Sequence, residues 1–148
     1  IRLHTRLPVV LPERIDAGLL DLLRNAGRPV VTVIHANHAN EFDSAVDAAL
    51  AQLRSTGATV LNQAVLLRGV NDNIEALVAL SQRGFAAGAL PYYLHQLDRV
   101  AGAAHFEVSD EEALVLHAAL IARMPGYLVP KLVREVAGDP GKRPLVKP

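Results

Sequence analysis

Short apolar runs alternate with longer segments of helical periodicity along the whole chain. The run VVTVI at positions 30–34 is continuous and β-branched, which is typical of a strand covered on both faces. Residues 109–112 match a capping box, with Ser first and Glu three positions later, and predict the start of a helix. The predicted strands cover residues 1–5, 30–34, 59–61, 89–94 and 127–132, and the predicted helices cover 12–26, 41–55, 72–82 and 109–123.

This alternation predicts an α/β fold with a parallel sheet. The strands start about thirty residues apart, which is the repeat expected of βαβ units. The number of units is roughly half that of a complete (β/α)8 barrel, which takes about 250 residues. A half barrel leaves one strand edge unpaired. We therefore expect that edge to meet a missing half, another copy of the chain, or the chain itself.

The composition fits a folded domain and argues against several classes of function. The chain has 148 residues, of which 51% are hydrophobic, and its 15 Lys and Arg balance 15 Asp and Glu. A net charge of zero and few aromatic residues argue against nucleic-acid binding. No apolar run reaches the ~20 residues of a membrane span, and the first residues do not have the layout of a signal peptide. A cytoplasmic location without membrane contact is therefore expected.

The chain contains no cysteine, so its own residues supply no disulfide, thiol nucleophile or iron–sulfur ligand. It also opens on strand-like residues without a starting Met. We therefore expect it to be a fragment of a longer protein.

Polar side chains follow three consecutive predicted strands, at the end where parallel α/β folds carry their binding sites. These side chains are His35, Asn37, His38 and Asn40 after the second strand, Asn62, Gln63, Arg68, Asn71 and Asp72 after the third, and His95, Gln96, Asp98 and Arg99 after the fourth. Three polar strand ends in register predict a site for a polar ligand.

Two features of these loops have a second interpretation. The spacing of His35 and His38, with His95 as a third ligand, suits a metal ion, but hydrogen bonding of the rings to loop backbone is the favoured interpretation. The tail sequence GDPGKRP is not a phosphate-binding loop, because Arg143 stands where Ser or Thr is needed. On composition alone, Lys142 is expected to be a solvated tail lysine.

Seven ordered blocks spanning essentially the whole chain resemble the lysine 2,3-aminomutases. They are LPVVLPERI, VIHANHANE, VLNQAVLLRGVND, LPYYLHQLD, GAAHF, PGYLVPKLVRE and GKRP. The LPYYLHQLD, GAAHF and PGYLVPKLVRE blocks look closest to the bacterial branch that supplies β-lysine for modifying elongation factor P. The resemblance implies the C-terminal half of a radical S-adenosylmethionine partial barrel with outer helices at residues 1–132, and a pyridoxal phosphate segment at residues 133–148.

The implied activity is an isomerisation that moves the α-amino group of L-lysine to the β carbon. Its implied cofactors are pyridoxal phosphate, S-adenosylmethionine and a 4Fe-4S cluster, and its implied assembly is a homo-oligomer. The family's Cys-x-x-x-Cys-x-x-Cys motif and the arginines that bind substrate carboxylate and cofactor phosphate lie upstream of where this chain starts. We therefore expect the chain alone to be inactive, since no radical forms without the cluster.

The resemblance implies roles for single residues. Lys142 falls on the lysine that forms the Schiff base with pyridoxal phosphate, a task that needs a flexible primary amine. Asp98 and Glu135 fall on the two acidic positions that bind the distant ammonium of the substrate. The clostridial pattern has Asp at the second of these positions, so the longer Glu135 leaves the substrate register open.

Further positions are expected beside the cofactors. His35 and Gln63 match positions close to S-adenosylmethionine, to which they offer neutral donors and acceptors. Cofactor phosphate or methionyl contacts are expected of Asn62, Arg68 and Asn71. His95 stands where clostridial enzymes have a Tyr beside the pyridoxal ring, whereas Tyr92 and Tyr93 are expected to pack, one inward and one outward.

Two other functions remain open from the sequence. One is a stand-alone binding or interaction module that kept the fold after losing catalysis. The other is a pyridoxal enzyme without radical chemistry. A cysteine triplet in the upstream coding sequence distinguishes the radical enzyme from the stand-alone module.

Overall fold

Five parallel strands and a short antiparallel sixth form one sheet in the computed structural model, which describes residues 1–98, 101–136, 138–139 and 141–146. The strands are β1 (Arg2–Thr5), β2 (Val31–His35), β3 (Thr59–Val65), β4 (Leu90–His95), β5 (Lys131–Arg134) and β6 (Arg143–Pro144). They lie in sequence order across the sheet. This arrangement confirms the predicted α/β fold with a parallel sheet.

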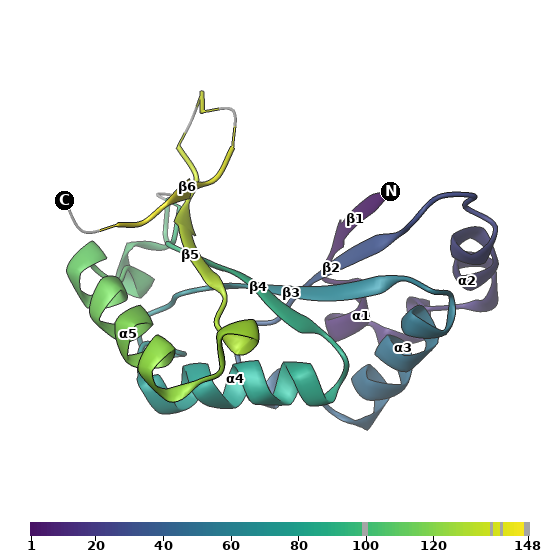
Figure 1. Cartoon of the computed structure of the whole chain (residues 1–148), viewed down its shortest axis with the longest axis horizontal. Coiled ribbons are helices and arrows are strands. Elements are labelled where there is room, and N and C mark those ends of the chain that lie inside the picture. Colours follow the sequence, from purple (N-terminus) through teal and green to yellow (C-terminus); the bar gives the residue numbers. More distant parts are fainter. Residues whose placement is uncertain (99–100, 137, 140, 147–148) are drawn as a thin grey trace.

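The helices pack along one face of this sheet, as Figure 1 shows. They are α1 (Leu7–Val10), α2 (Ala17–Arg24), α3 (Ser44–Ser55), α4 (Ile74–Ala86) and α5 (Asp110–Arg123), joined by the 3-10 turns η1 (Pro12–Arg14), η2 (Ala39–Glu41), η3 (Ala104–Phe106) and η4 (Gly126–Leu128). No helix of the described residues is long and apolar enough to cross a membrane. The opposite face of the sheet, here called the open face, has no helix over it in Figure 1.

The core lies between the sheet and its helices because side chains alternate along each strand. In β3, for example, Val60, Asn62 and Ala64 are buried, whereas Leu61 and Gln63 between them are half-buried. Large side chains that are at most 2% exposed fill this layer, among them Ile34, Leu50, Leu53, Leu66, Leu94 and Leu120. The same alternation directs Gln63 to the open face.

Several predicted helix boundaries are confirmed and others are wrong. The capping box at Ser109 is confirmed, because its hydroxyl accepts from the Glu112 N–H and the Glu112 carboxylate accepts in return. The predicted helix from residue 12 is wrong at its start, because α2 begins after Asp16, whose carboxylate accepts from the Leu19 N–H. The predicted start of the next helix at residue 41 is also wrong.

The helix predicted to follow Asn40 begins later. Asn40 lies within η2, and Asp43 caps α3 by accepting from the Val46 N–H. The helix predicted at residues 72–82 is shifted as well, because α4 covers Ile74–Ala86.

The C-terminal segment is joined to the sheet. The last strand predicted at 127–132 is shifted, because Tyr127 lies in η4 and β5 covers Lys131–Arg134. The expected boundary between residues 132 and 133 therefore falls inside β5. The tail folds back as β6 and pairs with β5.

Candidate functional site

Neighbouring strands place a row of polar and aromatic side chains across the open face. His35 pairs with Gln63 between β2 and β3, and Gln63 pairs with Tyr93 between β3 and β4. His95 lies two positions farther along β4, opposite Val65. From the edge strand, the ring of His4 approaches that of His35 to 6.2 Å between centroids.

Three buried polar atoms of this row lack a hydrogen-bond partner among the described residues. They are His35 Nε2, Gln63 Oε1 and His95 Nε2. Buried polar atoms in folded proteins are almost always bonded, so an unbonded group calls for an explanation. Because these three come from three adjacent strands and share one face, they indicate a site for a polar ligand.

The tail brings Lys142 to the same place. The β5–β6 pairing matches Val133 with Pro144 and Arg134 with Arg143, so the next facing pair is Glu135 and Lys142. Their side chains form an ion pair. Lys142 Nζ also lies 5.4 Å from the centre of the Tyr93 ring.

Tyr93 links this amine to the buried histidine of β4. Its ring lies edge-on to that of His95, with 5.6 Å between centroids. The amine of the tail and the row of unbonded polar atoms therefore form one cluster, which spans strands from β1 to β6.

The electrostatics of the cluster favour neutral imidazoles. Burial, aided by the positive charge of Lys142, lowers the pKa of His95 to about 4. The pKa of His35 is also lowered, first by burial and then by His4, Arg6 and Lys142. A neutral imidazole has one donor and one acceptor nitrogen, so both rings can bond a ligand that has both functions.

The two acidic candidates lie at the ends of β4 and β5. Glu135 is exposed, and the hydrogen bond from Lys142 holds the pKa of its carboxyl below the usual range. Asp98 is exposed in the segment after β4, and its charge acts to raise the pKa of His95, against the larger effect of burial. Both carboxylates therefore influence the same histidine-lined region.

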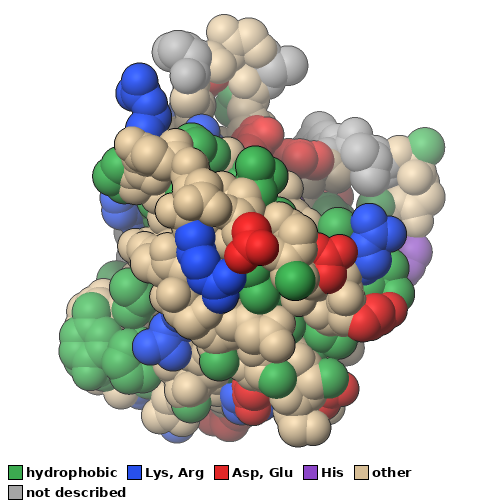
Figure 2. Space-filling model, turned by 90° about the vertical axis from the view of Figure 1, so that its right-hand side faces the viewer, with side chains coloured by type: hydrophobic (Ala, Val, Ile, Leu, Met, Phe, Trp, Pro, Cys, Tyr) green, Lys and Arg blue, Asp and Glu red, His purple; other side chains and the backbone are tan. Residues whose placement is uncertain are grey.

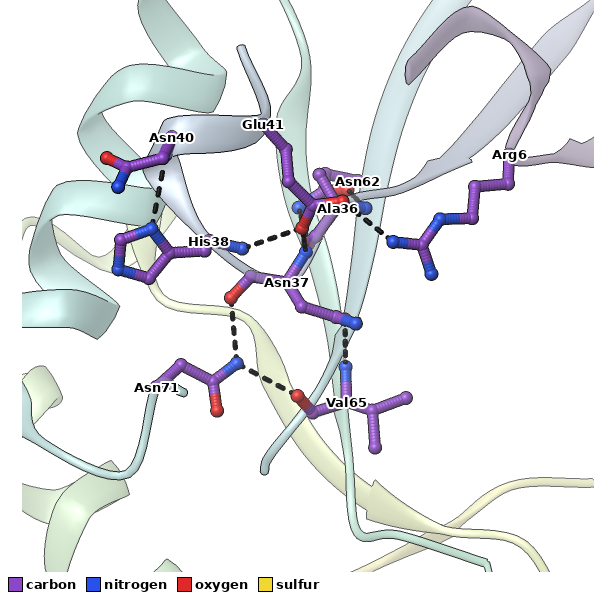
Figure 3. A network of polar contacts seen from close by, with 9 residues as sticks. All are labelled: Arg6, Ala36, Asn37, His38, Asn40, Glu41, Asn62, Val65 and Asn71. Carbon is purple, nitrogen blue, oxygen red and sulfur yellow. Dashed lines mark hydrogen bonds and ion pairs between the residues drawn. The ribbon is translucent and has the colours of Figure 1, made fainter. Parts of the chain in front are cut away.

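Asn62 and Asn71 are not part of this cluster, since their side chains are used inside the fold (Figure 3). Asn62 accepts from the Ala36 N–H at 2.9 Å and donates to the Ala36 carbonyl at 3.1 Å. Asn71, which is 0% exposed, donates to the Asn37 and Val65 carbonyls and accepts from the Leu67 N–H. These bonds tie the loops that follow β2 and β3 to each other.

Arg68 also has partners away from the cluster. Its guanidinium donates to the Glu107 carbonyl at 2.9 Å and to the Glu112 carboxylate at 2.8 Å, at the start of α5. The Asp72 carboxylate lies 4.0 Å from the same guanidinium. The structure thus gives Arg68 a role in joining the β3–α4 loop to α5, and its cofactor contact stays a prediction.

The second histidine of the H-x-x-H spacing has a local role. His38 Nδ1 accepts from the Asn40 N–H and caps η2, while the Glu41 carboxylate accepts from the Asn37 and His38 N–H groups (Figure 3). For His38, this is the favoured interpretation, in which the ring bonds to loop backbone rather than to a metal ion. Across the described ranges, no group of three or more His, Asp or Glu could hold a metal ion.

The expectation for the two tyrosines is wrong. Tyr92 and Tyr93 do not point to opposite faces: their ring centroids are 3.9 Å apart. The cause is a bulge, since Asn62 pairs with Pro91 while the next residue, Gln63, pairs with Tyr93. Proline inside a strand is a known sign of a bulge, so Pro91 was the available signal that Tyr93 faces the site.

Comparisons with known proteins find relatives over nearly the whole chain. No family model matches the chain. L-lysine 2,3-aminomutase of Escherichia coli (strain K12) is 51% identical over 145 residues, which are 98% of this chain and 42% of that protein. The enzyme of the same name from Haemophilus influenzae is 49% identical over 96% of this chain, and that from Clostridium subterminale is 34% identical over 99% of it.

A solved structure shares the fold. A radical SAM methyltransferase from Sphaerobacter thermophilus superposes with a TM-score of 0.58 and 18% sequence identity, covering 79% of this chain and 37% of that one. The chain spans about two fifths of the length of the bacterial relatives, as the 42% coverage shows. By sequence, nearly the whole of this chain is similar to part of the L-lysine 2,3-aminomutases of several organisms.

Proposed function

We propose that this chain is part of an isomerase that moves the α-amino group of L-lysine to the β carbon, and that its open face holds the substrate and two cofactors. The names of the relatives support the reaction. The observation that carries the proposal for this chain is the position of Lys142, whose amine lies 5.4 Å from the centre of the Tyr93 ring, which in turn lies edge-on to the buried His95.

The residues of the cluster fit an aldehyde cofactor with an aromatic ring. Lys142 offers the primary amine that would hold pyridoxal phosphate, and the Tyr93 and His95 side chains provide flat walls and a neutral nitrogen for its ring. His35 and Gln63, with one unbonded atom each, would hold S-adenosylmethionine. When bound, these two cofactors supply the electron sink and the radical that such an isomerisation needs.

The chain's own residues would then bind and orient the substrate. Asp98 and Glu135 would bind the terminal ammonium of L-lysine by charge-assisted hydrogen bonds, which select a long cationic side chain over a neutral one. Neutral His35 and His95 avoid repelling that cation. An iron–sulfur cluster does not fit this chain, which has no cysteine, so the ligands would come from another part of the protein.

The proposal includes a finer assignment. The product would serve the β-lysylation of elongation factor P in the cytoplasm, as supported by the resemblance of the LPYYLHQLD and PGYLVPKLVRE motifs to that branch. The active assembly would contain the remaining part of the protein and more than one copy. The comparisons do not favour a stand-alone module without catalysis.

The position of Lys142 can be tested by chemical labelling. Treating the chain with pyridoxal phosphate and then borohydride should attach the reduced cofactor to Lys142, as read by peptide mass spectrometry. Lys142→Arg keeps the charge and should remove the label. Lys131, an exposed lysine of β5, is the internal control, and preferential labelling at Lys131 would contradict the assignment.

The role of Asp98 can be tested in the intact enzyme. Asp98→Asn removes the negative charge at nearly constant shape, so L-lysine should bind at least tenfold more weakly while cofactor binding changes little. The measurement is the KM for L-lysine beside a pyridoxal phosphate titration. Equal weakening of both would argue against an ammonium site at Asp98.

A further inference from the structure

The position of Lys142 depends on a short stretch of backbone pairing. Strand β6 has two residues, which pair with β5 at Val133–Pro144 and at Arg134–Arg143. Pro144 has no N–H to donate to the ladder. A weakly specified register is prone to slip, and a slip of one residue turns every side chain to the other face. Backbone pairing alone is therefore a weak determinant of the face on which Lys142 lies.

The same register places two arginines directly opposite each other. Arg134 of β5 and Arg143 of β6 form a facing pair, so their side chains project from the same face of the hairpin. That face is opposite to the one that carries Glu135 and Lys142, because side chains alternate along a strand. Like charges directly opposite each other destabilise strand pairing. The register that places the amine therefore carries a repulsion of its own.

Each of these arginines is neutralised by a separate acid. The Asp139 carboxylate, in the bend, lies 2.7 Å from the Arg143 guanidinium. Asp110, the first residue of α5, accepts from both terminal nitrogens of Arg134, from Nη1 at 2.9 Å. A bidentate pair of arginine and carboxylate fixes direction as well as charge. The two acids therefore offset the repulsion at the register position next to Lys142.

Asp110 is itself held in place from β4. The side-chain amide of Gln96, which is 3% exposed, donates to the Asp110 carboxylate at 3.0 Å and to the Val108 carbonyl at 3.1 Å. Gln96 directly follows His95, the last residue of β4. The contacts therefore run from the strand that carries His95, through the start of α5, to the hairpin that carries Lys142.

We propose that Asp110 and Asp139 are positioning residues for Lys142. By neutralising the two facing arginines, they hold the hairpin in the register that turns the tail amine to the open face. Loss of either acid leaves one arginine charge uncompensated opposite the other, so the hairpin leaves this register for part of the time. This inference rests on the proposed function for what the amine does once it is in place.

The proposal can be tested by NMR without any cofactor. In the 148-residue chain, the Lys142 side chain should give nuclear Overhauser effects to the Tyr93 ring. Asp110→Asn should weaken these effects at least twofold. It should also raise the pKa of His95, because the Lys142 charge that helps to lower this pKa moves away. Glu111→Gln removes an exposed charge from the same turn of α5 and is the control, which should change neither measurement.

A rescue variant separates this role from a general effect on α5. Adding Arg143→Met to Asp110→Asn removes the repulsion from the other strand, so the contacts with the Tyr93 ring should return. A purely structural role of Asp110 at the start of α5 would not respond to a change on β6. Asp139→Asn is the second test, and Arg134→Met should rescue it in the same way. This pair of variants decides the question if Asp110→Asn does not fold.

Two results would overturn the proposal. One is unchanged contact between Lys142 and Tyr93 in the asparagine variants, and the other is a loss of contact that removal of the facing arginine does not restore. These measurements contain no pyridoxal phosphate, so they are independent of the labelling at Lys142. A chain that shows the loss and the rescue but takes no label would keep the positioning role and refute the proposed cofactor role.

Discussion

His95 combines deep burial with a charged neighbour. It is 7% exposed, its Nε2 has no partner among the described residues, and Lys142 acts on it across the Tyr93 ring. Burial penalises the protonated form first, and the Lys142 charge adds to that effect. The protonation of this ring is therefore coupled to the state of the tail amine.

The first prediction at this scale concerns the titration of His95. Lys142→Met removes a positive charge, so the pKa of His95 should rise from about 4 while staying below the ordinary value because burial remains. An NMR pH titration of the ring measures this. Lys131→Met is the control and should leave the titration unchanged, and a fall in pKa after Lys142→Met would contradict the arrangement.

The same shift makes stability depend on pH. The pKa of His95 in the folded chain is about 4, below the ordinary 6.5 of histidine, so between these values the unfolded chain binds more protons. Stability should then fall as pH drops from 6.5 to 4, by on the order of 2–3 kcal/mol at most, and be fully present above 6.5. His95→Gln should flatten this part of the profile in urea unfolding, and an unchanged slope would exclude His95 as its source.

At the scale of elements, the buried asparagines hold the ends of neighbouring strands together. Asn71 serves three backbone groups at once and is 0% exposed. Its bonds connect the loop after β3 to Asn37 after β2 (Figure 3). The row of polar side chains on the open face depends on these asparagine hydrogen bonds, because the bonds fix where the strands that carry His35 and Gln63 end.

Removing the Asn71 amide should be costly. Asn71→Ala leaves the Leu67 N–H and the Asn37 and Val65 carbonyls without their partner, so stability should fall by about 2–4 kcal/mol. Urea unfolding measures the change. Asn25→Ala, which removes one exposed hydrogen bond to the Asp21 carbonyl, should cost under about 0.5 kcal/mol. Similar losses in the two variants would contradict the role of Asn71.

The sequence predicts the position of some of these elements correctly and of others incorrectly, for physical reasons. The β-branched run 30–34 and the capping box at Ser109 carry their information locally, and both are found in the structure. The helix predicted from residue 41 begins instead after its cap Asp43, because residues 39–41 form the 3-10 turn η2.

The candidate site could likewise be predicted from the sequence only in part. The strand ends predicted that His35, Gln63 and His95 lie close together, and the structure places them on neighbouring strands, within β2, β3 and β4 rather than in the loops after them. The side-chain partners of Asn62 and Asn71 depend on contacts across strands, which spacing along the chain does not specify. The bulge that brings Tyr93 to Lys142 is likewise a property of strand pairing, with Pro91 as its only local sign.

At the scale of the whole molecule, the sheet has an open edge. β1 pairs with β2 alone, and at the other edge lies the two-residue β6. Figure 2 shows the face over α2 and α3 with Lys, Arg, Asp and Glu side chains interspersed. An uncovered strand edge invites pairing with another strand, so β1 is the edge at which self-association is to be tested.

Hydrogen exchange tests the state of this edge. Amides of β3, which lies between β2 and β4, should exchange slowest, and those of β1 should exchange faster in dilute solution. Raising the chain concentration should slow exchange in β1 and leave the exposed helix α2 unchanged if copies associate there. Concentration-independent exchange in β1 would place any self-association elsewhere.

The facing positions of Glu135 and Lys142 also define where this chain tolerates changes in length. Because strand register fixes both residues, extra amino acids inserted between positions 135 and 142 would enlarge the bend without moving the amine or the acid. The bend is therefore a suitable site for grafting a recognition sequence or a spectroscopic reporter close to Glu135 and Lys142.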